Sequence, residues 1–183
     1  TKGRAVSSIR AIANATANVV LDSIGRGAPF EAALESARLR GLAETDVSRD
    51  LDGNDSADKL AVLALVMAET GSGAVAIERD SIDVAGASIA SSTLEIASAL
   101  RARGERLRQV AVLHRDKNGM VGRVRLEALS DSDPLHAVDG DRNRFVLQLD
   151  DGSTHIVDGR GAGPCPTVTA ILGDLEESLS QRD

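Results

Sequence analysis

Apolar residues recur at helical spacing in three segments of the first part of the chain. Glycine follows the first two segments, at Gly25 and Gly41, and glycine is common directly after the last residue of a helix. The third segment begins after the turn residues Asp52-Gly53-Asn54. The pattern predicts helices over Ile9–Ile24, over Phe30–Arg40, and from Asn54 or Asp55 to about Glu69.

The middle of the chain has a weaker pattern. Ser81–Ala85 alternates between polar and apolar residues, which is compatible with a strand. Ser91 or Ser92 precedes a further helical repeat that continues to about Arg103. Glu95 lies three residues after Ser92, the spacing of a capping box, in which two side chains bind free backbone amides at a helix start. We therefore expect a helix between these serines and Arg103.

After Gly104 the apolar residues alternate at period two, as in half-buried strands. Turn-forming residues at Asp116–Gly119 and Asp150–Gly152 join the alternating segments into two hairpins, and a last helical repeat follows. The 104–160 region should therefore form a mixed, largely antiparallel sheet with helices packed on one face, an α+β fold in one domain of residues 1–183. The predicted elements are strands over Arg108–Arg115, Met120–Leu129, Asn143–Leu149 and Thr154–Val157, and a helix over Val168–Leu179.

Composition and charge exclude several classes of protein. Of the 183 residues 42% are apolar, but only Phe30 and Phe145 are aromatic, so the core must be aliphatic. The net charge of −7, without a long basic run, argues against nucleic acid as a partner, because phosphates need clustered Lys and Arg. The single cysteine, Cys165, and three dispersed histidines provide no disulfide and no typical metal site. No apolar run suits a membrane span or a signal peptide, so we expect a cytoplasmic protein without a membrane partner.

The stretch Gly41–Lys59 concentrates the candidate chemistry. It holds six acidic residues and one lysine. Asp55 and Lys59 are four residues apart and so share one face of the predicted helix. Such a pair is common on helix surfaces and contributes only about 0.2–0.5 kcal/mol. The additional acids of the preceding loop favour a site in which carboxylates surround one ammonium group; a solvated surface is the alternative.

Two further segments are candidates for ligand contact. Asn14–Asn18 is polar and small for part of a buried helix, and close helix packing is the favoured interpretation of these residues alone. Gly159–Thr167 is a glycine-rich turn between a predicted strand and the last predicted helix. Helix N-termini attract anions, and glycine lets a ligand approach the backbone. A tight packing turn explains the same residues at least as well.

Taken together, these motifs resemble homoserine dehydrogenases, which reduce aspartate-4-semialdehyde to homoserine. The family pattern G-Y-A-E-x-D-P, followed by D-x-x-G-x-D-x-A-x-K-L, is similar to residues 41–60, and N-G-T-T-N-Y is similar to residues 14–19. The family's G-x-G-A-G-x-x-P-T is similar to residues 159–167, and its H-P-L-A-x-V-x-G is similar to residues 133–140. Ala15 replaces a family glycine, Val19 a tyrosine and Arg160 a proline, departures that bear on the substrate more than on the fold.

The resemblance implies a role for each matching residue. Lys59 would donate the proton to the new alcohol, and Asp55 would orient it as the second catalytic residue. The substrate, a small amino acid, would be bound by Glu44, Asp50, Thr16 and Asn14, and the nicotinamide end of NAD or NADP would lie against Gly161, Ala162, Gly163 and Thr167.

The resemblance also implies that the chain is the catalytic and dimerisation half of such an enzyme. No strand, glycine turn and helix of Rossmann type precedes Asn14, so the nucleotide should be bound mainly by a domain not in this chain, and the half should be inactive alone. Exposed sheet edges and the family both suggest a homodimer. The rival interpretation is a catalytically inactive paralogue that serves as a binding or oligomerisation module.

Overall fold

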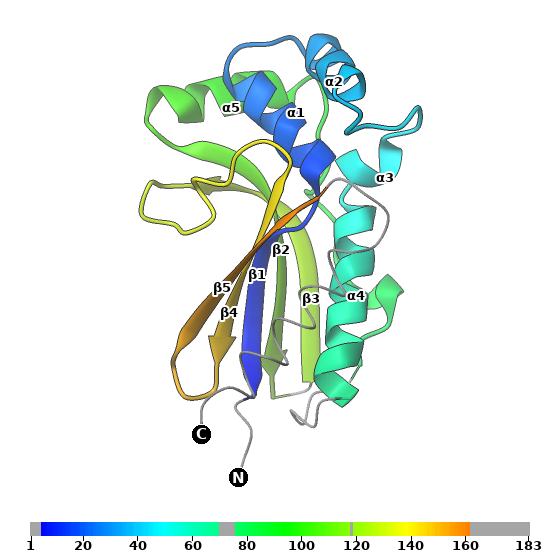
Figure 1. Cartoon of the computed structure of the whole chain (residues 1–183), viewed down its shortest axis with the longest axis vertical. Coiled ribbons are helices and arrows are strands. Elements are labelled where there is room, and N and C mark those ends of the chain that lie inside the picture. Colours follow the sequence, from blue (N-terminus) through cyan, green and yellow to red (C-terminus); the bar gives the residue numbers. More distant parts are fainter. Residues whose placement is uncertain (1–4, 70–75, 118, 162–183) are drawn as a thin grey trace.

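The computed structural model describes residues 5–69, 76–117 and 119–161, and within them the chain has an α+β fold (Figure 1). The described strands form one sheet of order β3-β2-β1-β4-β5, in which every neighbouring pair is antiparallel. The strands are β1 (Val6–Ile12), β2 (Arg106–Asp116), β3 (Gly119–Leu129), β4 (Arg142–Leu149) and β5 (Thr154–Arg160). The helices are α1 (Ala15–Gly25), α2 (Phe30–Leu39), α3 (Ser48–Leu51), α4 (Asn54–Glu69) and α5 (Thr93–Ala102), with a 3₁₀ turn η1 (Arg79–Ser81).

The predicted helix Ile9–Ile24 is wrong in its first part, because this part is strand β1 at the centre of the sheet. Ile9 pairs with Leu113 of β2 on one side and with Leu147 of β4 on the other. These partners lie more than a hundred residues away, so the local spacing carries no sign of them. The helix begins only after Asn14, which has an extended backbone (φ −130°, ψ 117°) and whose Oδ1 accepts from the Ala17 amide at 2.8 Å.

Three smaller predictions are also corrected. Ser81–Ala85 is not a strand: Ser81 ends η1, and only an isolated bridge joins Asp83 to Arg123. The capping box does not form, because Ser92 has helical dihedrals and makes no side-chain cap bond. Instead, Thr93 Oγ1 accepts from the Ala90 amide at 3.0 Å. The loop before Asn54 contains the short helix α3, and the predicted helix Val168–Leu179 lies outside the described residues.

Apolar packing on one face of the sheet fixes the position of α4. The helix lies along the sheet beside β3, while α1, α2 and α5 gather at one end (Figure 1). Burial of one leucine contributes about 1.5–3 kcal/mol, several times the effect of an i,i+4 ion pair. The placement of Asp55 and Lys59 is therefore a consequence of this packing. The α4 residues buried against Ile9, Ala11, Leu113, Phe145 and Leu147 are Ala57, Leu60, Leu63, Ala64 and Met67.

A second apolar core joins α1, α2 and α5, through residues such as Val20, Ala33 and Leu100. It holds the start of α1 close to α3, at the end of the sheet where β1 finishes (Figure 1). None of the helices in the described ranges is long and apolar enough to cross a membrane.

Candidate active site

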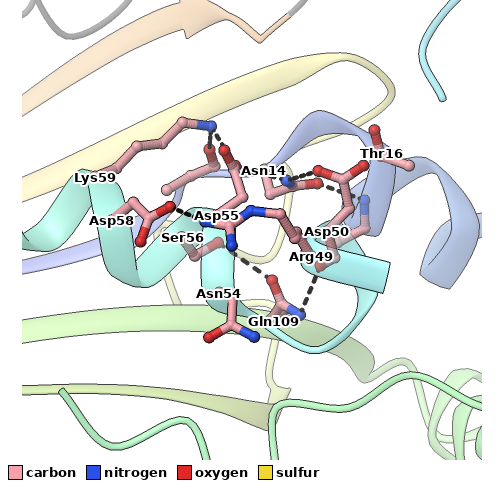
Figure 2. A network of polar contacts seen from close by, with 12 residues as sticks. Asn14, Thr16, Arg49, Asp50, Asn54, Asp55, Ser56, Asp58, Lys59 and Gln109 are labelled. Atoms are coloured by element: carbon pink, nitrogen blue, oxygen red, sulfur yellow. Dashed lines mark hydrogen bonds and ion pairs between the residues drawn. The ribbon is translucent and has the colours of Figure 1, made fainter. Parts of the chain in front are cut away.

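The Lys59 amine is held at the point where β1 passes into α1. Its Nζ donates to Asp55 Oδ2 at 2.6 Å and to the carbonyl oxygen of Ala13 at 2.8 Å. The Lys59 side chain is 25% exposed and that of Asp55 33%, so both are accessible from solvent. An ammonium group has three N–H donors, and within the described residues the third has no acceptor. Figure 2 shows the amine at the edge of the polar network.

The side-chain amide of Asn14 connects two carboxylates of this network (Figure 2). Its Nδ2 donates to Asp50 Oδ1 and to Asp55 Oδ2, both at 2.7 Å. Its Oδ1 accepts from the Ala17 amide, and the residue is 5% exposed. Asn14 thus joins α1, α3 and α4, and both of its donor hydrogens are already used within the protein.

Asp50 has a pKa above its ordinary value. Burial is the main cause, and the nearby negative charge of Asp55 adds to it. The Asn14 hydrogen bond and the positive charge of Lys59 act in the opposite direction. The carboxyl therefore lies in a partly desolvated position, in contact with the site through Asn14.

The corner between α3 and α4 sets the direction in which Asp55 and Lys59 project. Gly53 forms this corner with φ +85°, a conformation that favours glycine. A Cβ at this position would lie 2.7 Å from Ala87 Cβ and 3.1 Å from Val124 Cγ1. Gly53 is therefore required both for its backbone conformation and because the corner packs closely against Ala87 and against Val124 of β3.

Gln109, which the sequence analysis did not single out, holds the same corner from β2. Its Nε2 donates to the carbonyl oxygens of Asp50 at 3.2 Å and of Ala87 at 3.1 Å, and its Oε1 accepts from Ser56 Oγ. Gln109 is 4% exposed. The sequence does contain a sign of this role, because Gln109 directly precedes the apolar run Val110–Leu113 and should be buried with it. A buried polar side chain needs hydrogen-bond partners, which predicts that Gln109 ties neighbouring segments together.

The other predicted substrate residues lie differently. Glu44 is exposed and makes no hydrogen bond or ion pair within the described part of the chain. Thr16 is buried, and its hydroxyl donates to the Leu42 carbonyl. The structure thus brings Asn14, Asp50, Asp55 and Lys59 together, with Thr16 beside Asp50, and leaves Glu44 outside this cluster.

Most acids of the 41–59 stretch do not surround the Lys59 amine. Asp46 and Asp52 accept from the backbone amides of Ser48 and Asn54, two residues further on in each case. Asp58 pairs with Arg79 at 2.7 Å and also with Arg49. The expected ring of carboxylates is therefore reduced to Asp55, with Asp50 joined to it through Asn14.

The glycine-rich segment begins beside the same junction. A Cβ on Gly161 would lie 2.7 Å from Ala15 Cβ and 2.9 Å from Asn143 Oδ1, so only glycine fits where β5 meets the start of α1. Asn143 Oδ1 is buried and has no hydrogen-bond partner among the residues that the structure describes. Ala162, Gly163 and Thr167, the other predicted cofactor residues, lie outside the described residues.

A hollow of about 200 Å³, partly open solvent, lies away from this cluster between α1, α5 and β2. The buried pair Arg108 and Asp22 lines it, at 3.1 Å and with 1% and 4% of their side chains exposed. Arg26 and Arg106 also lie within 4 Å of Asp22. Because Asp22 and Asp139 both pair with Arg106 and Arg108, these charges have partners within the protein, and we interpret the group as a structural tie between α1 and β2. In the described ranges no group of three or more His, Cys, Asp or Glu residues could hold a metal ion.

Comparison with known proteins identifies a family of relatives for the chain. The sequence pattern of the family described as homoserine dehydrogenase matches residues 1–175. The chain is 33% identical to the homoserine dehydrogenase of Methanocaldococcus jannaschii, with 94% of this chain and 48% of the relative covered. It is 34% identical to that of a Synechocystis strain, with 94% and 40% covered. The chain therefore spans less than half the length of these two relatives.

Solved structures give the same relationship. A homoserine dehydrogenase from Thiobacillus denitrificans superposes with a TM-score of 0.77 at 26% identity, covering 94% of this chain and 38% of the other. A putative homoserine dehydrogenase from Archaeoglobus fulgidus superposes with a TM-score of 0.70 at 28% identity, covering 96% and 51%. With a match over nearly its whole length and the motif residues clustered at one site, the chain belongs to the homoserine dehydrogenase family.

Proposed function

We propose that the chain is the catalytic part of an NAD(P)-dependent homoserine dehydrogenase that reversibly reduces aspartate-4-semialdehyde to homoserine. The observation that carries the proposal is the Lys59 amine, held by Asp55 and by the Ala13 carbonyl on residues that match the family motif. The family membership supports an oxidoreductase, and the geometry of the lysine supports proton transfer to an oxygen.

In the reductive direction, the nicotinamide, when bound, supplies a hydride to the aldehyde carbon. Negative charge then develops on the aldehyde oxygen. The third N–H of Lys59, which has no acceptor within the described residues, is the proton that this oxygen receives. The resulting alcohol is neutral, and the lysine amine regains a proton from solvent. In the oxidative direction the neutral amine accepts the hydroxyl proton.

The charges of the cluster suit an amino-acid substrate. Asp50 and Asp55 carry two negative charges when ionised, and Lys59 offsets one of them. The remaining negative charge favours an α-ammonium group beside this cluster, and the family resemblance adds the exposed Glu44 to the same interaction. This arrangement opposes the rival interpretation of an inactive module, because charged groups without a use are costly to retain in a partly buried site.

Of the four residues predicted to contact the cofactor, Gly161 lies within the described residues, so its surroundings can be compared with what a nicotinamide needs. It leaves no room for a side chain between Ala15 and Asn143, and it brings the start of the glycine-rich segment to the N-terminal end of α1. This packing within the protein accounts for the glycine at 161, so the cofactor role proposed for the segment rests on the family resemblance. Residues 161–163 and Thr167 would hold the nicotinamide end, and we propose that most nucleotide contacts come from a part of the enzyme outside this chain.

The outer edge of β5 supports the proposed homodimer. In the described residues no strand pairs beyond β5, whereas on the outer side of β3 Val124 and Leu126 donate backbone hydrogen bonds to the carbonyl oxygens of Asp83 and Gly86. Ile156 of β5 is 51% exposed. A strand at the end of the sheet order that carries an exposed apolar residue favours association between copies, which sedimentation equilibrium would measure.

The function is tested by turnover in the full-length protein, with aspartate-4-semialdehyde and either NADH or NADPH. Lys59→Ala should lower kcat by about 100- to 10,000-fold, the usual range for loss of an acid–base group. Lys117→Ala, at an exposed lysine of the β2–β3 hairpin, is the matched control and should retain wild-type turnover. Near-normal turnover in Lys59→Ala would remove Lys59 from the mechanism, and no turnover of the wild type with either nucleotide would reject the dehydrogenase.

A further inference from the structure

Asn14 occupies a central place among the polar contacts of the site, although the family resemblance assigns it to substrate binding. Its amide nitrogen has two hydrogens, and each is donated to a carboxylate oxygen at 2.7 Å, one of Asp50 and one of Asp55. Its oxygen accepts from the Ala17 amide. With 5% of the residue exposed and both donors used, Asn14 has no hydrogen left for a substrate.

The orientation of the amide is set by the helix that it caps. The Ala17 amide can only donate, so it selects the Asn14 oxygen and turns the nitrogen toward the two acids. A carboxylate or a hydroxyl could cap α1 equally well, since Asn, Asp and Ser are comparable N-cap residues. An amide is the one among these three side chains that both accepts at the cap and donates two hydrogens.

The segment Ala13–Asn14 also contacts Lys59 and Asp55 at once. The Ala13 carbonyl accepts from Lys59 Nζ, and the next residue donates to the carboxylate oxygen that pairs with the same amine. Asp55 Oδ2 thus receives one hydrogen from Asn14 and one from Lys59. The carboxylate can rotate away from the amine only if it gives up the Asn14 bond.

We infer that Asn14 is the positioning residue of the site: its amide holds the carboxylates of Asp50 and Asp55 together and so fixes Asp55 beside the Lys59 amine. The inference rests on the proposed function, because it assigns Asn14 an effect on Lys59 rather than a contact with substrate. It implies that Asn14 contributes to the orientation of the proton donor before any substrate arrives.

The test is a series of three side chains that all cap α1. Asn14→Asp keeps the acceptor for Ala17 but places a third carboxylate against Asp50 and Asp55, and Asn14→Ser keeps the acceptor with one donor instead of two. In the full-length protein kcat should fall about 10-fold in Asn14→Ser and about 100-fold in Asn14→Asp, the range found when supporting residues of a site are lost. Equal turnover in the three proteins would show that Asn14 only caps the helix and would overturn the inference.

A double-mutant cycle with Asp50→Asn provides a second readout. In Asn14→Asp/Asp50→Asn the amide and the carboxylate exchange places, so a donor again faces an acceptor. Asp50→Asn should therefore partly restore both kcat and the urea midpoint in the Asn14→Asp background, while additive effects would contradict the inference. Lys59→Ala is assayed alongside: an inactive Lys59→Ala with an unaffected Asn14→Asp rejects only the positioning role. If the wild type shows no turnover, the urea midpoints alone decide.

Discussion

Gly53 provides the sharpest test of how the corner before α4 is built. Gly53→Ala places a methyl group on a residue with φ +85°, and that methyl lies 2.7 Å from Ala87 Cβ and 3.1 Å from Val124 Cγ1. The left-handed backbone costs about 1–2 kcal/mol for a residue with a Cβ. Overpacking of a buried site costs about 1–3 kcal/mol more. We therefore expect the free energy of unfolding to fall by about 2–5 kcal/mol, a large part of the roughly 5–15 kcal/mol typical of a domain.

Gly152→Ala is a closely matched control. Gly152 has φ +84° in the β4–β5 turn, and an added Cβ has no atom within 4 Å. This variant therefore carries the backbone cost without the steric cost, and the difference between the two variants isolates the packing of the corner. Urea unfolding of both proteins, followed by far-UV circular dichroism, measures that difference. Equal losses of stability in the two variants would refute the packing argument for Gly53.

A compensating change separates the two contacts of the new methyl. Ala87→Gly removes the 2.7 Å contact and leaves the 3.1 Å contact with Val124 Cγ1. In the Gly53→Ala background it should recover part of the lost stability, although Ala87→Gly alone is destabilising because Ala87 is fully buried. Turnover should follow the same order, because the corner lies two residues before Asp55 and sets the direction of its side chain.

Two further predictions concern buried charge. Burial raises the pKa of Asp50 above its ordinary value of 3.8, so the folded state binds this proton more tightly than the unfolded state does. The wild type should therefore lose stability as the pH rises from the pKa of the unfolded state through the higher pKa of the folded state. Asp50→Asn should remove that loss in urea unfolding from about pH 3 to pH 7, whereas an unchanged pH dependence would contradict the assignment. Arg108→Met should lower the free energy of unfolding by about 3 kcal/mol, the lower end for a broken buried pair, because Arg26 and Arg106 still lie within 4 Å of Asp22. In the Arg108→Met background Asp22→Asn should cost less than it does alone, and additive losses would show that the two side chains are not coupled.

Local pattern was sufficient where an element depends on its own residues. The two hairpins combine alternation with turn residues, and both are confirmed by the register of β2 with β3 and of β4 with β5. Helix α4 has a strong apolar repeat and a glycine corner before it, and its predicted start agrees with Asn54. Asp55 and Lys59 follow directly from the position of that helix, because residues four apart share a face.

Strand β1 could not be recognised in this way. Its residues Ile9, Ala11 and Ile12 fit a helical repeat as well as a strand, and the apolar spacing continues into α1. Residues 6–12 form a strand because β2 and β4 pair with them on both sides, and this pairing exists only in the folded chain. An Asn14 read as a helix cap would have placed the boundary correctly, since Asn is a preferred N-cap residue.

The site was predicted only in part for a related reason. The second acceptor of the Lys59 amine is the backbone carbonyl of Ala13, and a backbone group leaves no trace in the residue type. Asp46, Asp52 and Asp58 add to the acidic composition that suggested a charged site. In the structure, however, Asp46 closes a turn, Asp52 accepts from the amide at the start of α4, and Asp58 belongs to a surface ion-pair group. The number of acidic residues in a segment therefore indicates less about a site than the contacts made where two elements meet, as β1 and α1 do at Ala13 and Asn14.

The contacts of Lys59 explain why the amine can be ordered before substrate binds. Fixing a lysine side chain costs up to about 2 kcal/mol of rotamer entropy. A hydrogen bond to a charged group contributes about 1.5–3 kcal/mol, and the ammonium makes two, to Asp55 at 2.6 Å and to the Ala13 carbonyl at 2.8 Å. The two bonds together exceed the entropic cost even after allowance for partial exposure. With two N–H groups fixed, the direction of the third is determined by tetrahedral geometry, and a proton donor with a fixed direction needs little reorganisation when charge develops on the substrate oxygen.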